Sequence, residues 1–152
     1  MSEEQERLLQ MVARLVARSV RADDGTGCLR WTGTHNPKGY GQVVVEGQLR
    51  QVHRVAHKVW LGPIPDGHEG DHVHARGCRW RDCIEPRHLE AVTHAENVAR
   101  SLALVTHCPN GHELTEANVK PYRTTKGYIG RKCRTCFNEN RAAWRANRKA
   151  SA

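Results

Sequence analysis

The sequence has few aromatic residues and no long hydrophobic run. Phe, Trp and Tyr make up 5% of its 152 residues, and the mean hydropathy is -0.71. No apolar stretch approaches the roughly 20 residues of a transmembrane helix, and the charged segment 1–20 lacks the pattern of a signal peptide. We therefore expect a cytoplasmic protein with no membrane partner. Since so little apolar material makes a thin core, additional stabilisation by metal ions is favoured.

The six cysteines are spaced as metal ligands rather than as a disulfide framework. Cys78, Cys83 and His88 follow one another with four residues in each interval, and Cys28 is the remaining cysteine before residue 107. Three sulfurs and one imidazole complete a closed tetrahedral zinc site. This zinc ion would stabilise the fold and leave no open position for a substrate.

A second set of ligands has sharper spacing. Cys108 and His112 are separated by three residues, and Cys133 and Cys136 by two. The intervening segment YRTTKGYIGRK predicts a β-hairpin between the two pairs. The spacing therefore predicts a second structural zinc site with three cysteines and one histidine.

The net charge of +8 is concentrated towards the C-terminus. Residues 107–152 contain 10 Lys and Arg against 3 Asp and Glu, whereas residues 1–106 contain 14 against 13. This asymmetry favours a polyanion as partner, and a merely solvated basic surface is the alternative. The residues expected to contact DNA phosphates here are Lys132, Arg134, Arg141, Arg145 and Arg148.

The local patterns predict an α+β fold. Helices are expected at 2–20, where Ser2 and Gln5 form a capping box, at 53–62, and from Thr93 onward. Residues 21–39 read as a loop that contains a short strand. The segments expected as strands are CLRWTG, which carries Cys28, the hairpin YGQVVVEGQLRQV with its turn at Glu46-Gly47, and DHVH at 71–74.

Three residues of the segment GDHVHARGCRWRDCIEPRHL are left over once the zinc ligands are assigned, namely Asp71, His72 and His74. Histidine is the natural general base near neutral pH. His72 on a strand, a cross-linked loop and Asn97 on the following helix indicate one reaction centre. The other histidines are expected to be surface or packing residues: His35, His53, His57, His68, His94 and His107.

The ordered set DH, C-x4-C, HL and EN resembles the HNH, or His-Me finger, nucleases, and WTG...KGYGQV with HRVAHKVWLGPIPDG resembles their phage and actinobacterial members. The first zinc ligand set is similar to that of the His-Cys box homing endonucleases. The resemblance covers residues 27–104 and implies a zinc-stabilised ββα-metal core. We therefore expect an N-terminal helix and linker at 1–26, a nuclease domain at 27–106 and a zinc module with a basic tail at 107–152.

The resemblance also implies a role for each residue of the reaction centre. His72 matches the general base that activates water, Asn97 matches a ligand of the catalytic divalent ion, and Asp71 binds that ion in many members. Oxygen ligands of this kind suit Mg²⁺. His88 matches a catalytic-metal ligand in zinc-free members and a zinc ligand in the His-Cys box type, and the cysteine spacing favours zinc. Glu85 stands where the family usually has the Asn that braces the loop carrying the base.

The expected function is that of a metal-dependent DNA endonuclease, which hydrolyses phosphodiester bonds to 5'-phosphate and 3'-hydroxyl ends. Arg50 and Arg54 are both candidates for contact with the scissile phosphate. A monomer with one active site would nick DNA, and paired cuts would require a homodimer. The alternative is a non-catalytic, zinc-stabilised DNA-binding protein with a degenerate centre, which Glu85 favours. Structured RNA is a further substrate class.

Overall fold

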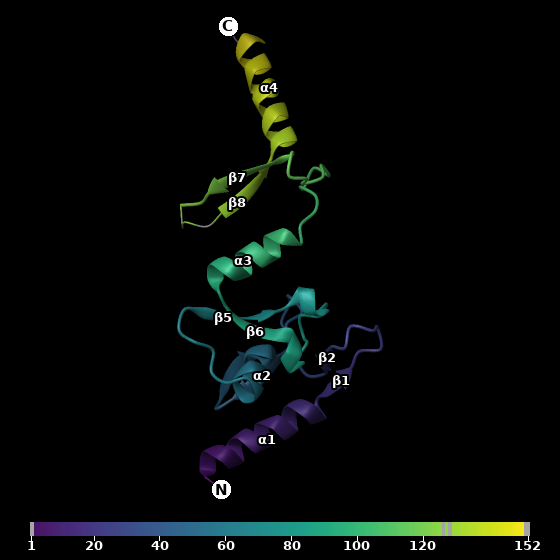
Figure 1. Cartoon of the computed structure of the whole chain (residues 1–152), viewed down its shortest axis with the longest axis vertical. Helices are drawn as coiled ribbons and strands as arrows, with labels where there is room; N and C mark the ends of the chain where they lie inside the picture. Colours follow the sequence, from purple (N-terminus) through teal and green to yellow (C-terminus); the bar gives the residue numbers. More distant parts are fainter. Residues whose placement is uncertain (1, 126, 128, 151–152) are drawn as a thin grey trace. The chain divides into compact units, whose positions relative to one another are not determined.

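The structure, a computed structural model, describes residues 2–125, 127 and 129–150, and its contacts divide the chain into two compact units, Met1–His94 and Ala95–Ala152. The described residues form helices and two-stranded antiparallel sheets, which confirms the α+β class (Figure 1). The boundary between the two units falls before residue 107, where we expected the C-terminal zinc module to begin. As a result, most of α3 (His94–Ala103) belongs to the second unit.

The first unit begins with α1 (Glu3–Ala17), and its predicted capping box is confirmed. The Ser2 hydroxyl accepts a hydrogen bond from the Gln5 backbone N–H, and the Ser2 backbone N–H donates to the Gln5 side chain. The apolar side chains of α1 pack only in part, because Leu15 is fully buried whereas Val16 is half exposed. After α1, the chain forms an antiparallel pair, β1 (Ser19–Arg21) and β2 (Leu29–Trp31). The predicted helix at 2–20 is therefore too long at its end, because residues 19 and 20 belong to β1.

A hairpin and a helix follow, both as predicted. Strands β3 (Gln42–Val45) and β4 (Gln48–Gln51) are joined at Glu46 and Gly47, and both turn residues have positive φ, at 49° and 73°. This is the conformation of a two-residue type I′ turn. Helix α2 (Val52–Trp60) starts directly after β4 and is followed by Gly62, whose φ of 98° suits glycine.

The last pair of strands in the first unit is β5 (His68–His72) with β6 (Leu89–Thr93), antiparallel to one another. The prediction of a strand over DHVH is partly wrong, because β5 ends at His72 and His74 lies in a short 3-10 helix, His74–Arg76. The chain turns here because the Arg76 backbone N–H bonds to the Val73 carbonyl. A second 3-10 helix, Pro86–His88, leads into β6.

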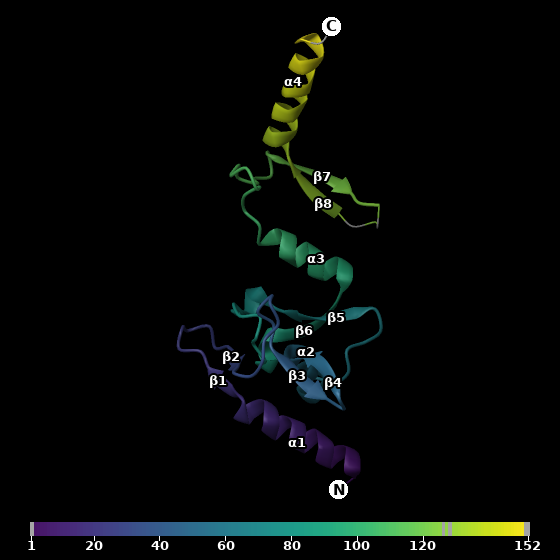
Figure 2. The same ribbon diagram turned by 180° about the vertical axis from the view of Figure 1, so that it is seen from behind.

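The elements of the first unit pack around one apolar core. Figure 2 shows two of them, α2 and the β3–β4 hairpin, from behind. The buried side chains come from α1, β2, β3, α2, the loop before β6 and β6 itself, and they are Leu15, Trp31, Val43, Val52, Ala56, Ile84 and Leu89. Among the described residues, every fully buried hydrophobic side chain lies between Leu15 and Val92. The first unit therefore contains the hydrophobic core.

The second unit combines α3 with a hairpin and a terminal helix. Strands β7 (Val119–Arg123) and β8 (Ile129–Cys133) are antiparallel, which confirms the predicted hairpin, and α4 (Arg134–Ala150) follows β8 directly. Helix α4 has no buried residue. Among the described residues, no helix combines the length and apolar character needed to cross a membrane.

Candidate functional site

The first cluster consists of Cys28, Cys78, Cys83 and His88, the four predicted ligands, and all four are buried. The Cys28 and Cys78 sulfurs are 4.0 Å apart, and His88 Nδ1 lies 3.5 Å from the sulfurs of Cys28 and Cys83. Tetrahedral Zn–S bonds of about 2.3 Å place ligand atoms roughly 3.5–3.8 Å apart. The donor set and its spacing therefore fit a zinc ion, and His88 belongs with the cysteines.

The surroundings of the first cluster disfavour a free thiolate at Cys83. A hydrogen bond with Cys78 and burial raise the pKa of the Cys83 thiol above its usual value. A zinc ion binds the thiolate and offsets this cost. The loop that carries Cys83 is also held by backbone contacts with β2. Cys83 forms an isolated β-bridge with Arg30, and the Ile84 backbone N–H donates to the Leu29 carbonyl.

The second cluster consists of Cys108, His112, Cys133 and Cys136, again as predicted. The Cys108 sulfur lies 3.6 Å from both His112 Nδ1 and the Cys136 sulfur, and Cys133 Sγ lies 3.7 Å from His112 Nδ1. These separations also fit a tetrahedral zinc ion. In the part of the chain that the structure describes, these two clusters are the groups of three or more Cys, His, Asp or Glu residues whose ligand atoms lie close enough together to hold a metal ion.

Asn118 supports the second cluster and was not predicted from the sequence. Its amide N–H donates to the Cys133 sulfur at 3.5 Å, and its amide oxygen accepts from the Thr135 backbone N–H and hydroxyl. The backbone N–H of Cys136 lowers the pKa of the Cys133 thiol to about 6, which favours the thiolate. Asn118 thus links the β7 end of the hairpin to the first turn of α4.

His72, the predicted general base, is bonded to the backbone of a first-cluster ligand. Its Nε2 lies 2.9 Å from the Cys83 carbonyl oxygen. A carbonyl oxygen only accepts hydrogen bonds, so Nε2 carries the proton and, in the neutral ring, Nδ1 keeps the lone pair. Burial lowers the pKa of His72 from its ordinary value. The same loop that supplies Cys83 to the cluster therefore fixes the orientation of this imidazole.

Two further rings pack against His72. The His53 and His72 ring centroids are 4.6 Å apart, and Tyr40 lies 5.6 Å from His53 and 6.3 Å from His72. His53 is 3% exposed, and its Nδ1 has no hydrogen-bond partner among the described residues. Burial and the neighbouring His72 lower the pKa of His53 to about 3. His53 is a packing residue, as expected, but no sequence signal indicated that it packs on His72.

The two arginine candidates for the scissile phosphate differ in position. Arg54 follows His53 on α2, and a Cβ added at Gly70 of β5 would lie 3.4 Å from Arg54 Cγ and 3.5 Å from His53 Cδ2. Arg50 is on the exposed β3–β4 hairpin, where it bonds to Gln48. Arg54 is therefore the one placed beside the strand that carries His72.

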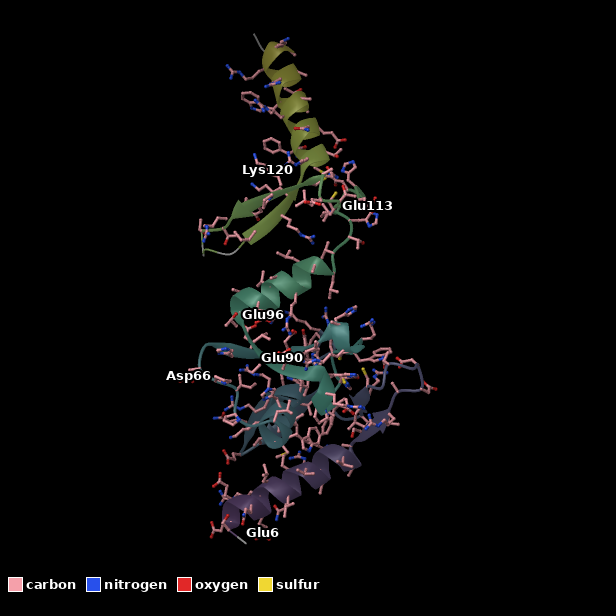
Figure 3. The ribbon with its side chains drawn as sticks, in the orientation of Figure 1. Glu6, Asp66, Glu90, Glu96, Glu113 and Lys120 are labelled. Atoms are coloured by element: carbon pink, nitrogen blue, oxygen red, sulfur yellow. The ribbon has the colours of Figure 1, made fainter. Side chains whose placement is uncertain are left out.

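Asp71 lies on the opposite face of β5 from His72, because successive side chains of a strand alternate. It pairs in register with Glu90 of β6, which is labelled in Figure 3. Arg76 contacts Glu90 at 3.3 Å, and His94 contacts Glu69 at 2.8 Å on the same strand pair. Asp71 thus lies among carboxylates, which are hard oxygen donors.

Glu85, which replaces the usual Asn of the resembling family, is buried and held by two arginines. Its carboxylate accepts from Arg21 at 2.5 Å and from Arg87 at 3.1 Å. Burial opposes ionisation, but these hydrogen bonds hold the pKa of Glu85 below its usual value. The side chain is therefore an anion that connects the β1–β2 pair to the loop before β6.

The remaining predicted residues lie in the second unit. Asn97 is in the first turn of α3. Lys132 Nζ lies 4.5 Å from the Tyr122 ring centroid, and Arg134 donates to the Val119 carbonyl. Residues three or four apart on α4 share one face, and that face carries Phe137, Arg141, Trp144, Arg145 and Arg148. Figure 3 shows Lys120 on β7, and its Nζ lies 5.4 Å from the Phe137 ring.

Comparison with known proteins identifies a phage relative. No family model matches the chain. No solved structure matches it either. Protein 7.7 of Escherichia phage T7 is 31% identical over 102 residues, which cover 64% of this chain and 75% of the phage protein. The chain therefore belongs to the same family as Protein 7.7 of Escherichia phage T7.

Proposed function

We propose that the protein is a metal-dependent DNA endonuclease in which His72 is the general base and the first cluster holds a structural zinc ion. The observation that carries this proposal is the hydrogen bond from His72 Nε2 to the Cys83 carbonyl. It ties the imidazole to a loop that a metal ion would fix at Cys78 and Cys83. The motif order and ligand spacing of the sequence resemble those of the HNH nucleases, and this resemblance supports the same assignment.

The chemistry of His72 follows from its tautomer. With Nε2–H donated to a carbonyl, the Nδ1 lone pair is the position that accepts a proton. His72 would take this proton from a water molecule, and the resulting hydroxide would attack phosphorus and displace the 3' oxygen. The products would carry 5'-phosphate and 3'-hydroxyl ends.

The resemblance assigns Asp71 and Asn97 as ligands of the catalytic ion, and the oxygen chemistry of both side chains fits such an ion. Bound Mg²⁺ would stabilise the negative charge that develops on the phosphate and on the leaving oxygen. Asp71 is adjacent to His72 in β5 but on the other face of the strand, next to Glu90, so its role as a ligand is assigned from the resemblance. The role of Asn97 rests on the resemblance alone.

Arg54 is the arginine we assign to the scissile phosphate. Its stem lies against Gly70, two residues before His72, whereas Arg50 lies on an exposed hairpin. A guanidinium can hold a phosphate through two parallel hydrogen bonds. Arg54→Ala should therefore weaken cleavage much more than Arg50→Ala.

The second unit would anchor the protein on the DNA backbone. Its exposed helix α4 places Arg141, Arg145 and Arg148 on one face, and residues 107–152 carry most of the net positive charge. Each cation that neutralises a duplex phosphate adds about 0.9 to the slope of log affinity against log salt. Replacing these three arginines by Ala should weaken binding and reduce the slope by about 2 to 3.

The test is cleavage of supercoiled plasmid by the zinc-loaded chain, with and without Mg²⁺. His72→Ala should reduce the rate by about 100-fold or more, the usual contribution of a general base. His74→Ala is the matched control, because this exposed neighbour lies in the 3-10 helix after β5, and it should cleave at the native rate. Equal rates for His72→Ala and the native chain would contradict the proposal.

A second candidate function is DNA binding without catalysis. Glu85 favours it, because the anion that replaces the usual Asn is committed to Arg21 and Arg87. In that case, the zinc-loaded chain would bind plasmid tightly in Mg²⁺ and leave it uncut.

A further inference from the structure

A cavity of about 590 Å³ lies in the first unit, a volume within the usual range for small-molecule sites. Its lining comes from β2, from the loop that holds His35, and from Arg79–Asp82. The last segment joins the first-cluster ligands Cys78 and Cys83, so a metal ion there would fix both of its ends. None of the residues proposed for catalysis lines this cavity.

The cavity contains an aromatic platform in a fixed orientation. The indole N–H of Trp80 donates to Asp24 at 2.6 Å, and the Arg30 guanidinium lies 3.7 Å from the Trp80 ring centroid. Arg30 is held in turn by two hydrogen bonds to the buried carboxylate of Asp82. Trp80 is nevertheless 38% exposed. Arg30 covers one face of this ring, so a flat ligand would stack against the other face.

Two guanidinium groups in the lining have uncompensated charge. Arg79 donates to the carbonyls of His74 and Cys78, and Arg81 donates to the carbonyl of Lys38. Neither arginine forms an ion pair with any residue that the structure describes. The carbonyl bonds position the cations without neutralising them, so the cavity attracts an anion.

The cavity adjoins the proposed catalytic centre through one aromatic ring. The Arg81 guanidinium lies 5.4 Å from the Tyr40 ring centroid, and Tyr40 lies 6.3 Å from the His72 ring. A DNA strand whose scissile phosphate lies at His72 would therefore continue past Tyr40 towards Arg81.

We propose that this cavity binds one nucleotide of a DNA strand near the cleaved bond, with its unpaired base stacked on Trp80 and its phosphate held by Arg79 and Arg81. A nucleotide combines the flat ring and the anion that the lining accommodates. The base must be unpaired, because only an unstacked base exposes its face to an aromatic side chain. The placement of this subsite near the cleaved bond rests on the proposed function, because it takes His72 as the catalytic residue.

The test measures binding of a labelled single-stranded DNA hexamer by fluorescence anisotropy. The protein is the zinc-loaded, full-length His72→Ala chain in buffer without Mg²⁺, so no cleavage occurs. Adding Trp80→Ala should weaken binding by about 10-fold, the usual effect of removing one base stack. Trp80→Phe should bind within a few-fold of the parent, because it keeps an aromatic face.

The charge of the subsite is tested by salt dependence. Changing both Arg79 and Arg81 to Ala should lower the slope of log affinity against log salt by about 0.7, the value for one single-strand phosphate contact. Arg7→Ala is the matched control, because Arg7 is exposed on α1, pairs only with Glu3 among the described residues and is remote from the cavity lining. Its slope should equal that of the parent.

Two results would overturn the subsite. One is equal hexamer affinity for Trp80→Ala and the parent, and the other is equal weakening by Trp80→Ala and Trp80→Phe with unchanged zinc content and thermal stability. These outcomes are separable from failure of the nuclease proposal. If binding depends on Trp80 but the native chain does not cleave plasmid, the subsite is supported and the nuclease proposal is rejected. If the native chain cleaves plasmid but Trp80→Ala does not change binding, the nuclease proposal is supported and the subsite is rejected.

Discussion

The two clusters share one ligand chemistry and differ in their surroundings. In the first, all four ligands are buried, and the carbonyl of one ligand residue, Cys83, accepts a hydrogen bond from His72. In the second, the ligands are only partly buried, and the side-chain amides of Asn110 and Asn118 donate to the sulfurs of Cys136 and Cys133. The first cluster belongs to a unit that also has a hydrophobic core, whereas the described part of the second unit has no buried hydrophobic side chain.

A metal ion would therefore have a different structural role in each cluster. In the second unit, a bound ion would take the place of a hydrophobic core and hold the β7–β8 hairpin against the start of α4. In the first unit, a core that includes Leu15 and Ile84 already stabilises the fold. The ion would hold in one position the loop that orients His72. The predictions below test this contrast, from the largest expected effect to the smallest.

Loss of the second metal ion should unfold the second unit. Cys133→Ser removes one ligand, and structural zinc is worth roughly 10–16 kcal/mol of apparent binding free energy in small domains. Amide signals from residues 105–150 should collapse in NMR spectra, because none of the described residues of this region has a buried hydrophobic side chain. Signals from the first unit serve as the internal control. A native second unit without its metal would contradict the contrast.

Loss of the first metal ion should have a smaller effect on folding. Cys83→Ser should lose one equivalent of zinc and destabilise the first unit by on the order of 4 kcal/mol, while the apolar core keeps it folded at low temperature. Urea unfolding and zinc analysis measure both effects. Ala22→Ser is the matched control, because Ala22 packs against this cluster without supplying a ligand. Complete unfolding by Cys83→Ser would make the two clusters equivalent.

The stability of the first unit should fall in mild acid because of His53. Its folded-state pKa of about 3 is below the ordinary 6.5, so the unfolded chain binds this proton more readily. The contribution is fully present above pH 6.5 and declines as the pH falls towards 3, by up to about 1.4 kcal/mol per pH unit.

The measurement is urea unfolding of the zinc-loaded chain between pH 7 and pH 5.5. His53→Gln lacks the titrating group and is expected to show a shallower pH dependence. Identical pH dependence in the two proteins would show that His53 is not the buried neutral imidazole described here.

The smallest expected effect is that of Glu85. Glu85→Gln weakens its contacts with Arg21 and Arg87, and we expect a loss of about 1 kcal/mol in the free energy of unfolding. Glu90→Gln is the control, since the ion pair between Glu90 and Arg76 is partly exposed. A plasmid cleavage rate within a few-fold of the native one would show that Glu85 stabilises the loop without acting in the reaction.

The sequence predicted local structure and ligand sets well, because these depend on short-range patterns. The capping box at Ser2, the turn at Glu46-Gly47 and both metal clusters are confirmed. Contacts between distant segments could not be predicted in this way. Nothing in the α2 sequence indicates that His53 packs on His72, and the Arg79–Asp82 cavity forms only when the first-cluster loop meets β2. The early end of β5 depends likewise on the turn at Arg76.

The central claim is that the first cluster orients His72 through the Cys83 carbonyl. The most direct test is ¹⁵N NMR of the His72 imidazole in the zinc-loaded, full-length chain at neutral pH. We predict the neutral ring protonated at Nε2, with the hydrogen bond to Cys83 lost when Cys83→Ser releases the ion. A ring protonated at Nδ1, or one unchanged by Cys83→Ser, would contradict the account.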